Sequence, residues 1–238
     1  MKIALIGYGK MGKAIEKIAL SKGHEIVLRI DLENNHELTT QNLLNSDVAI
    51  EFTGPSSAFT NLIKCTEAGI PAVCGSTGWL KEYSVIRDAF QKNGSAFLYA
   101  SNFSIGVNIF FELNKKLANL MATHPEYMAG IREIHHTHKL DAPSGTAITL
   151  AEQIISEIPT LKNWINKTGE KSGELPIISE RLDPAPGTHE VKYQSAIDDI
   201  EIIHTAHNRD GFAGGAVLAA EFIQHKKGIY SMKDVLGF

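Results

Sequence analysis

Three histidines and a lysine lie within residues 135–139, inside the run Glu-Ile-His-His-Thr-His-Lys-Leu-Asp-Ala-Pro-Ser-Gly-Thr that spans 133–146. Histidine gains and loses protons near neutral pH, and lysine supplies a positive charge. The Pro-Ser-Gly-Thr turn leads into a helical pattern, and free backbone N–H groups at a helix start bind anions. A proton donor, a cation and an anion site together suit a small dicarboxylate that must accept a proton.

Residues 130–138 have the pattern of a strand, in which side chains alternate between the two faces. We therefore expect His136 and His138 on one face and His135 on the other. Ser144 is a favourable N-cap for a helix over 145–157. The backbone N–H groups of Gly145 and Thr146 would then be free to hold a carboxylate.

Two other interpretations of these histidines remain open. A zinc site is one, but no cysteine or His-x-x-His pattern completes a tetrahedral set, and Lys139 is an unfavourable neighbour for a cation. We therefore expect no metal. The second is that the histidines are only packed or solvated side chains on an edge strand.

A glycine-rich loop lies at the start of the chain. Residues 2–6 form an apolar run typical of a buried strand, and Gly7-Tyr8-Gly9-Lys10-Met11-Gly12 follows it. Apolar residues then recur at helical spacing. The G-x-G-x-x-G pattern therefore has the strand before it and the helix after it that dinucleotide binding requires.

Asp31 ends the second predicted strand, 25–30. A carboxylate at this place can accept hydrogen bonds from the ribose hydroxyls of the adenosine, although an ordinary surface carboxylate is the alternative. Leu32 and Glu33 follow, so no arginine is present to hold a 2′-phosphate. This favours NADH as cofactor, and Lys10 leaves NADPH as a second one.

Strands and helices alternate through residue 104, which predicts an α/β fold with a Rossmann-type doubly wound parallel sheet. After that, predicted strands follow one another directly, which predicts an α+β substrate domain with an open mixed sheet. We place the dinucleotide-binding domain at 1–104 and 213–238 and the substrate-binding and oligomerisation domain at 105–212. A connection through Gly169, Gly173 and Pro176 lies in the second domain, and a last helix is expected over 216–225.

The composition excludes several classes of protein. The net charge of −4 argues against a nucleic-acid surface. No apolar run approaches ~18 residues, so no membrane span is expected. The chain opens directly on a strand pattern, so we expect no cleavable signal, and two cysteines make no disulfide framework. These features together predict a cytoplasmic protein.

The 135–146 segment resembles the His-His-x-His-Lys-x-Asp-Ala-Pro-Ser-Gly-Thr motif of the 4-hydroxy-tetrahydrodipicolinate reductase (dihydrodipicolinate reductase) family. Three other segments also resemble family motifs. They are Gly-Ser-Thr-Gly at 75–78, Ala-Ser-Asn-Phe-Ser-Ile-Gly-Val-Asn at 100–108, and Asn-Arg-x-x-Phe-Ala-x-Gly-Ala at 208–216. The resemblance therefore extends over nearly the whole chain.

The resemblance implies a pyridine-nucleotide enzyme of lysine and diaminopimelate biosynthesis that reduces a small cyclic dicarboxylate. It implies that His135 donates the proton and that Lys139 is its cationic partner. The expected substrate-binding residues are His136, Ser144, Gly145 and Thr146. The expected cofactor-binding residues are Gly7, Tyr8, Gly9, Lys10, Met11, Gly12, Asp31, Gly75, Ser76, Thr77, Ala100, Ser101, Asn102 and Phe103. A homotetramer and closure of the two domains during catalysis are also expected.

Some features stay open. Thr137 stands where the family often has arginine, and the chain is shorter between its second and third strands. Cys74 would be the nucleophile if the protein were instead an aspartate-semialdehyde dehydrogenase, although a buried, inert thiol is the favoured interpretation. A non-catalytic nucleotide-sensing protein is the other alternative. We expect His189 in a plain turn, and Arg209 either holds a substrate carboxylate or supports the hinge.

Overall fold

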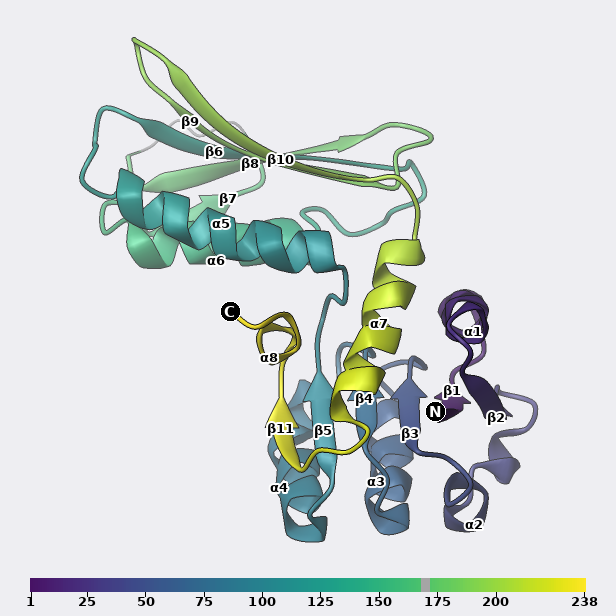
Figure 1. Ribbon diagram of the computed structural model, residues 1–238. Coiled ribbons are helices and arrows are strands. Elements are labelled where there is room, and N and C mark those ends of the chain that lie inside the picture. The colour runs from purple at the N-terminus through teal and green to yellow at the C-terminus, as the bar shows by residue number, and fades with distance from the viewer. Residues whose placement is uncertain (168–171) are drawn as a thin grey trace. The chain divides into compact units, whose positions relative to one another are not determined.

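Short apolar strands separated by helices build the first unit, residues 1–105 and 210–238. In the computed structural model, which describes residues 1–167 and 172–238, its strands form a parallel sheet in the order β11-β5-β4-β3-β1-β2 (Figure 1). The strands are β1 (Lys2–Ile6), β2 (Glu25–Ile30), β3 (Val48–Glu51), β4 (Ala72–Cys74), β5 (Ala96–Tyr99) and β11 (Gly228–Tyr230). Most of their residues are buried, as expected for a sheet covered on both faces.

Helices cover both faces of this sheet, which confirms the predicted doubly wound fold (Figure 1). One face carries α1 (Lys10–Ser21), α7 (Asp210–Ile223) and α8 (Met232–Leu236). The other face carries α2 (Thr40–Leu43), α3 (Ala58–Ala68) and α4 (Tyr83–Asn93), with short 3-10 turns at Asn35–Glu37 and Leu80–Glu82. Two separate apolar cores result, one on each side of the sheet.

The strand order places β2 and β3 on opposite sides of β1. The chain therefore reverses its direction of winding at β1, and ligands of such sheets bind beyond the carboxyl ends of the strands at this point. The predicted cofactor segments follow the ends of β1, β2, β4 and β5. All of them consequently lie at the carboxyl ends of the strands of the same sheet.

The second unit, residues 106–209, contains a five-stranded mixed sheet in the order β10-β9-β6-β8-β7. Its strands are β6 (Met128–His135), β7 (Asn163–Ile165), β8 (Glu174–Arg181), β9 (Gly187–Gln194) and β10 (Asp199–Ala206). Strand β6 runs parallel to β8 and antiparallel to β9, which confirms the predicted open mixed sheet. Helices α5 (Ile105–Met121) and α6 (Gly145–Glu157) pack on one of its faces.

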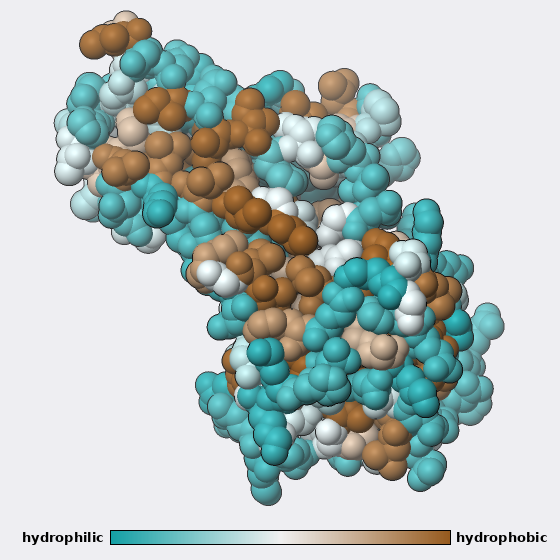
Figure 2. All heavy atoms as spheres, viewed as in Figure 1, coloured by the Kyte–Doolittle hydropathy of each residue, from teal (hydrophilic) through white to brown (hydrophobic). Residues whose placement is uncertain are grey.

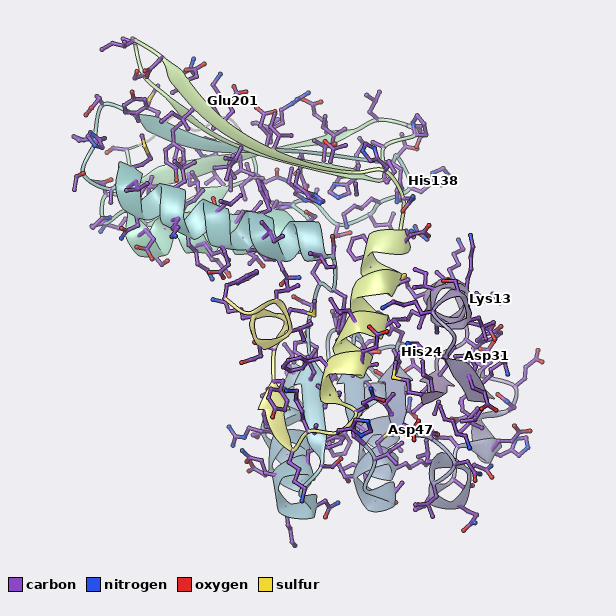
Figure 3. All side chains as sticks on the ribbon, in the orientation of Figure 1. Lys13, His24, Asp31, Asp47, His138 and Glu201 are labelled. Atoms are coloured by element: carbon purple, nitrogen blue, oxygen red, sulfur yellow. The ribbon has the colours of Figure 1, made fainter. Side chains whose placement is uncertain are left out.

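The two faces of this sheet differ in character. Ile131, Ile177 and Val191 are buried against the helices. The residues that alternate with these along each strand point away from the helices. Some of them form ion pairs, such as Arg132 Nε with Glu180 Oε1 at 2.9 Å. Glu201 on β10 points to this open face (Figure 3) and pairs with Lys192 at 3.0 Å. The open face therefore carries ion pairs between side chains of neighbouring strands.

Helix α5 also carries exposed apolar side chains, and hydrophobic residues gather over this helix in Figure 2. Leu113 is 51% and Leu120 is 68% exposed. Within the described part of the chain, no helix is long and apolar enough to cross a bilayer.

Several element boundaries differ from prediction. Strand β6 ends at His135 rather than 138, because residues 136–138 enter a turn. Helix α7 begins at Asp210 rather than 216, although it contains three glycines of low helix propensity. One of these glycines is required where the helix packs. A Cβ on Gly215 would lie 1.8 Å from the carbonyl oxygen of Phe103.

Two short strands, β7 and β11, were not predicted. The connection expected through Gly169, Gly173 and Pro176 is shorter than predicted because β8 begins at Glu174, and Gly169 lies outside the described residues. The division between the units falls after Ile105 and after Arg209, beside the predicted boundaries.

Candidate active site

The helix-covered face of the second sheet changes from apolar to polar toward the end of β6. Glu133 and His135 continue the inward-facing row that begins at Ile131, and their exposed fractions are 0% and 8%. Glu133 lies opposite Ser179 of β8 and opposite His189 of β9. A carboxylate, a hydroxyl and two imidazoles are therefore enclosed where the pattern would otherwise place core residues.

Glu133 is the centre of this group. Its oxygens accept the backbone N–H of Ser144 at 3.0 and 3.1 Å, and Oε1 accepts the hydroxyl of Ser179 at 2.7 Å. The guanidinium of Arg181 lies 3.6 Å from Oε1. Burial opposes ionisation, but hydrogen bonds involving His189, Ser144 and Ser179 outweigh it and hold the pKa of Glu133 well below its usual range. Glu133 is therefore a carboxylate at neutral pH.

Ser144 connects this group to helix α6. Its Oγ accepts the N–H of Ala147 at 3.2 Å, which confirms the predicted N-cap. The same Oγ lies 3.0 Å from Nε2 of His189. His189 is buried within β9, so the prediction of a plain turn was wrong. The pairing of β9 with β6 extends the strand past that turn pattern and brings His189 to Glu133.

His135 lies against His189, with ring centroids 5.0 Å apart. Burial, followed by the charge of His189, lowers the pKa of His135 to about 4, and the charge of Glu133 opposes this shift. Its Nδ1 lies 3.4 Å from Oε2 of Glu133 but makes no hydrogen bond with any described residue. Its Nε2 faces Gly187, where a Cβ would lie 3.1 Å away.

The loop after β6 carries the remaining predicted residues. The rings of His136 and His138 are 6.2 Å apart, although both lie in a turn and not on a strand. Figure 3 labels His138, which is exposed. Between them, Thr137 donates its backbone N–H and its hydroxyl to Asp183. These two bonds to a residue 46 positions away in the sequence fix the turn, and strand alternation cannot predict them.

Lys139 forms an ion pair with Asp141 at 2.7 Å, so its charge lies on the same loop as the histidines. Arg181 donates to the backbone oxygens of Lys139 and Asp141 and thereby ties this loop to β8. Gly145 and Thr146 begin α6 directly after the cap. Arg181, which the sequence did not indicate, thus fixes the backbone of the loop that carries the predicted cation.

The group also has the distances of a metal site, since one ligand atom each of Glu133, His135 and His189 lie within 4.8 Å of one another. However, both oxygens of Glu133 already accept hydrogen bonds. The Arg181 guanidinium beside them would repel a cation. These contacts favour a hydrogen-bonding network over a metal centre.

In the first unit, the glycine loop has the shape that a pyrophosphate needs. Gly7 has φ of +101°, and a Cβ there would lie 2.3 Å from the carbonyl oxygen of Phe52. A Cβ on Gly12 would lie 2.3 Å from the carbonyl oxygen of Gly7. Around Gly9 no described atom lies within 4 Å of a Cβ, and α1 begins beside it without a side-chain cap. The open helix start therefore fits an anion.

Asp31 is exposed directly after β2 (Figure 3), and its Oδ1 accepts the N–H of Leu32 at 2.8 Å. The nearest basic residue in the sequence, Arg29, pairs with Glu16, whose carboxylate also accepts the hydroxyl of Tyr8. The charge of Arg29 is therefore balanced by a carboxylate of α1.

The two further segments that were predicted to bind the cofactor both contact Phe52, which was not itself predicted. A Cβ on Gly75 would overlap its ring, and the ring of Phe103 lies 5.5 Å from it. Ser76 is buried, and its hydroxyl has no hydrogen-bond partner among the described residues. Asn102 Oδ1 accepts the N–H of Ser104 at 2.9 Å.

Cys74 is buried at the end of β4, 3.1 Å from Oε2 of Glu51. Burial, then the charge of Glu51, raises the pKa of this thiol far above neutral. A thiolate nucleophile is not supported, which confirms the inert thiol and argues against an aspartate-semialdehyde dehydrogenase. Of the remaining polar candidates, His204 on β10 packs 6.0 Å from the ring of Phe110, and Arg209 is exposed.

Comparison with known proteins agrees with this geometry. The family model for the N-terminus of dihydrodipicolinate reductase matches residues 1–103, and that for the C-terminus matches residues 106–236. The chain belongs to the dihydrodipicolinate reductase family. Both sites described above lie within the matched residues.

Relatives in the dihydrodipicolinate reductase family extend over most of the chain. A 4-hydroxy-tetrahydrodipicolinate reductase of Christiangramia forsetii is 52% identical over 237 residues, covering 99% of this chain and 98% of the relative. One from Methanopyrus kandleri is 36% identical and covers 81% of this chain and 72% of the relative. The dipicolinate-bound dihydrodipicolinate reductase from Paenisporosarcina sp. TG-14 shares the fold, with a TM-score of 0.77, 24% identity and 97% coverage of both chains.

Proposed function

We propose that this protein reduces 4-hydroxy-tetrahydrodipicolinate to tetrahydrodipicolinate with a reduced nicotinamide cofactor, in the synthesis of lysine and diaminopimelate. The observation that carries this proposal is the match to one family over both units, with a relative 52% identical along 98% of its own length. The buried acid–base group beside a free helix start supports the same chemistry.

His135 is the proposed proton donor. When bound, the dihydronicotinamide supplies a hydride to the substrate ring. The electrons displaced in the conjugated imine must then be taken up by a proton. In the protonated ring of His135 one N–H bond breaks, its electron pair stays on the ring to give neutral imidazole, and the proton goes to the substrate. Lys139 supports this step as a nearby positive charge.

The carboxylates of the substrate are proposed to bind at the start of α6. The backbone N–H groups of Gly145 and Thr146 follow the Ser144 cap and lie in the first turn, where the helix favours anions. His136 adds a donor from the loop. This site needs no metal.

The family uses NAD(P)H, and we propose that this member prefers NADH and accepts NADPH more weakly. Asp31 after β2 and the pairing of Arg29 with Glu16 support this preference. The segments Gly7–Gly12, Gly75–Thr77 and Ala100–Phe103 are proposed to hold the cofactor.

We further propose a homotetramer in the cytoplasm. The open sheet face and the exposed apolar side chains of the second unit, including Ile203 on β10 at 56% exposure, support assembly. The two unpaired cysteines support a reducing compartment. Sedimentation that shows a stable monomer at micromolar concentration would reject the tetramer.

A coupled assay tests the proposed reaction. Pyruvate and aspartate semialdehyde are condensed enzymatically, and oxidation of NADH or NADPH is followed at 340 nm. We expect oxidation that depends on the condensation product and is lost in His135→Ala. Failure of both nucleotides to be oxidised would contradict the proposed function. Oxidation with aspartate semialdehyde alone would favour a different dehydrogenase.

A further inference from the structure

We infer that Glu133 is a positioning residue for the proton transfer: its buried carboxylate holds a proton on Nδ1 of His135 and thereby makes Nε2 the nitrogen that delivers one. The direction of delivery rests on the proposed function. The arrangement of protons on the ring is a property of the folded protein alone.

The position of the carboxylate is fixed by other bonds. Ser179 binds Oε1, and the N–H of Ser144 is shared between both oxygens at 3.0 and 3.1 Å. Oε2 then faces the two imidazoles, 3.4 Å from Nδ1 of His135 and 3.6 Å from Nε2 of His189. Because Glu133 has no exposed surface, it cannot turn away toward solvent.

The two imidazoles have different alternatives. Nε2 of His189 lies 3.0 Å from Oγ of Ser144 and so has a partner besides the carboxylate. Nδ1 of His135 is buried and has no hydrogen-bond partner among the described residues. A buried donor left unpaired is costly, so the carboxylate 3.4 Å away is the group that Nδ1 must use. Catalytic hydrogen bonds are often long without ligands and shorten when the site is occupied.

The consequence concerns Nε2. With one proton held on Nδ1, only Nε2 can give up a proton and leave a neutral ring that keeps its bond to Glu133. Gly187 leaves room at this nitrogen, because any Cβ there would lie 3.1 Å from it. When the Nε2–H bond breaks, the electron pair remains on the ring and the proton passes to the substrate. The negative charges of the bound dicarboxylate favour the protonated ring, so a proton taken up from solvent restores the imidazolium for the next turnover.

The charges around His135 show why the carboxylate matters. Four charged or titratable groups act on the ring, namely Glu133 of β6, His189 of β9, Arg181 of β8 and Lys139 of the following loop. Of these, only Glu133 favours the protonated ring. Without it, burial and the three neighbouring basic groups would all disfavour a charged proton donor.

Nitrogen-15 NMR of the full-length protein, without substrate or cofactor, tests this inference. The ring nitrogens of His135 are assigned by comparison with His135→Ala, and their shifts report which nitrogen is protonated. We expect the neutral ring to carry its proton on Nδ1. A neutral ring protonated on Nε2 would overturn the inference, even if the protein proved to be an active reductase.

A second measurement uses the variant Glu133→Gln. We expect the pKa of His135 to fall by roughly one unit or more, because the opposing negative charge is gone. Glu133→Asp should restore part of the shift, and Ser179→Ala, which keeps the carboxylate, should change it much less. An unchanged or raised pKa in a folded Glu133→Gln variant would contradict the inference. The tautomer measurement on the unaltered protein stands if that variant does not fold.

Discussion

In the proposed sites, the glycine loop of the first unit would hold its ligand by backbone N–H groups, whereas the proposed proton donor of the second unit is a side chain that the sheet has buried. The loop around Gly9 is open, and its fit depends on missing Cβ atoms. The group around Glu133 is enclosed, charged and bonded across three strands and a helix start. A backbone site binds by shape and dipole, but a proton donor needs groups that control its ionisation.

His135→Ala is the strongest test of the difference between the backbone site of the first unit and the buried side chains of the second. We expect kcat to fall roughly 10²- to 10⁴-fold, because the substrate loses its proton donor, while the Kd for NADH stays unchanged. Stopped-flow turnover and NADH fluorescence titration measure the two effects separately. His124→Ala, at a histidine with 54% of its side chain exposed in the same unit, is the matched control. Unchanged turnover in His135→Ala would remove this residue from the mechanism.

The buried group also predicts a dependence of stability on pH. The pKa of His135 is about 4 in the folded protein and 6.5 when unperturbed, so the fold favours the neutral ring. Its contribution is complete above pH 6.5 and is lost as the pH falls toward 4, because the unfolded chain then takes up the proton. Between pH 7.5 and 5.0, urea unfolding should show a loss of about 1–2 kcal/mol that His135→Gln lacks. Equal losses in both proteins would contradict this account.

Substitutions in the glycine loop of the first unit should change NADH binding and not the ionisation of a side chain. In Gly9→Ala the new Cβ enters open space, so Tm should stay the same while the Kd for NADH rises by about tenfold or more. In Gly12→Ala the Cβ would lie 2.3 Å from the Gly7 oxygen, so Tm should fall. Gly214→Ala, where a Cβ meets only Ile18 at 3.9 Å, is the control. Unaltered NADH affinity in Gly9→Ala would separate the loop from the pyrophosphate.

The smallest expected effect concerns nucleotide choice. Asp31→Ser removes a negative charge that would face a 2′-phosphate, so the ratio of kcat/KM for NADPH over NADH should rise several-fold, roughly threefold to tenfold. Asp47→Ser is the matched control, since Asp47 is also exposed but precedes β3, at the amino ends of the strands (Figure 3). If both variants leave the ratio unchanged, Asp31 does not face the ribose.

The same contrast explains what could be predicted from the sequence. The glycine loop is contiguous, and the strand before it and the helix after it are contiguous too, so its form follows from local pattern. The Ser144 cap and helix 145–157 were predicted for the same reason. Helix α7 was predicted too short, because the need for Gly215 arises only when α7 packs on the backbone of Phe103.

The residues that surround His135 could not be found this way. Ser179, Arg181 and His189 reach Glu133 through strand pairing, and the register of strands so distant in sequence is not given by local pattern. A signal was nevertheless present. Glu133 and His135 share the alternation of buried Ile131, as His189 shares that of Val191, so polar residues occupy positions where the pattern requires apolar ones. Such positions are expected at functional sites.

His135 is proposed to deliver a proton to a dicarboxylate held at the start of α6. A crystal structure with NADH and pyridine-2,6-dicarboxylate, a stable planar analogue of the proposed substrate, tests it most directly. The account predicts a carboxylate on the N–H groups of Gly145 and Thr146 and Nε2 of His135 directed at the ligand ring. A ligand bound elsewhere, or an imidazole directed away from the ring, would contradict it.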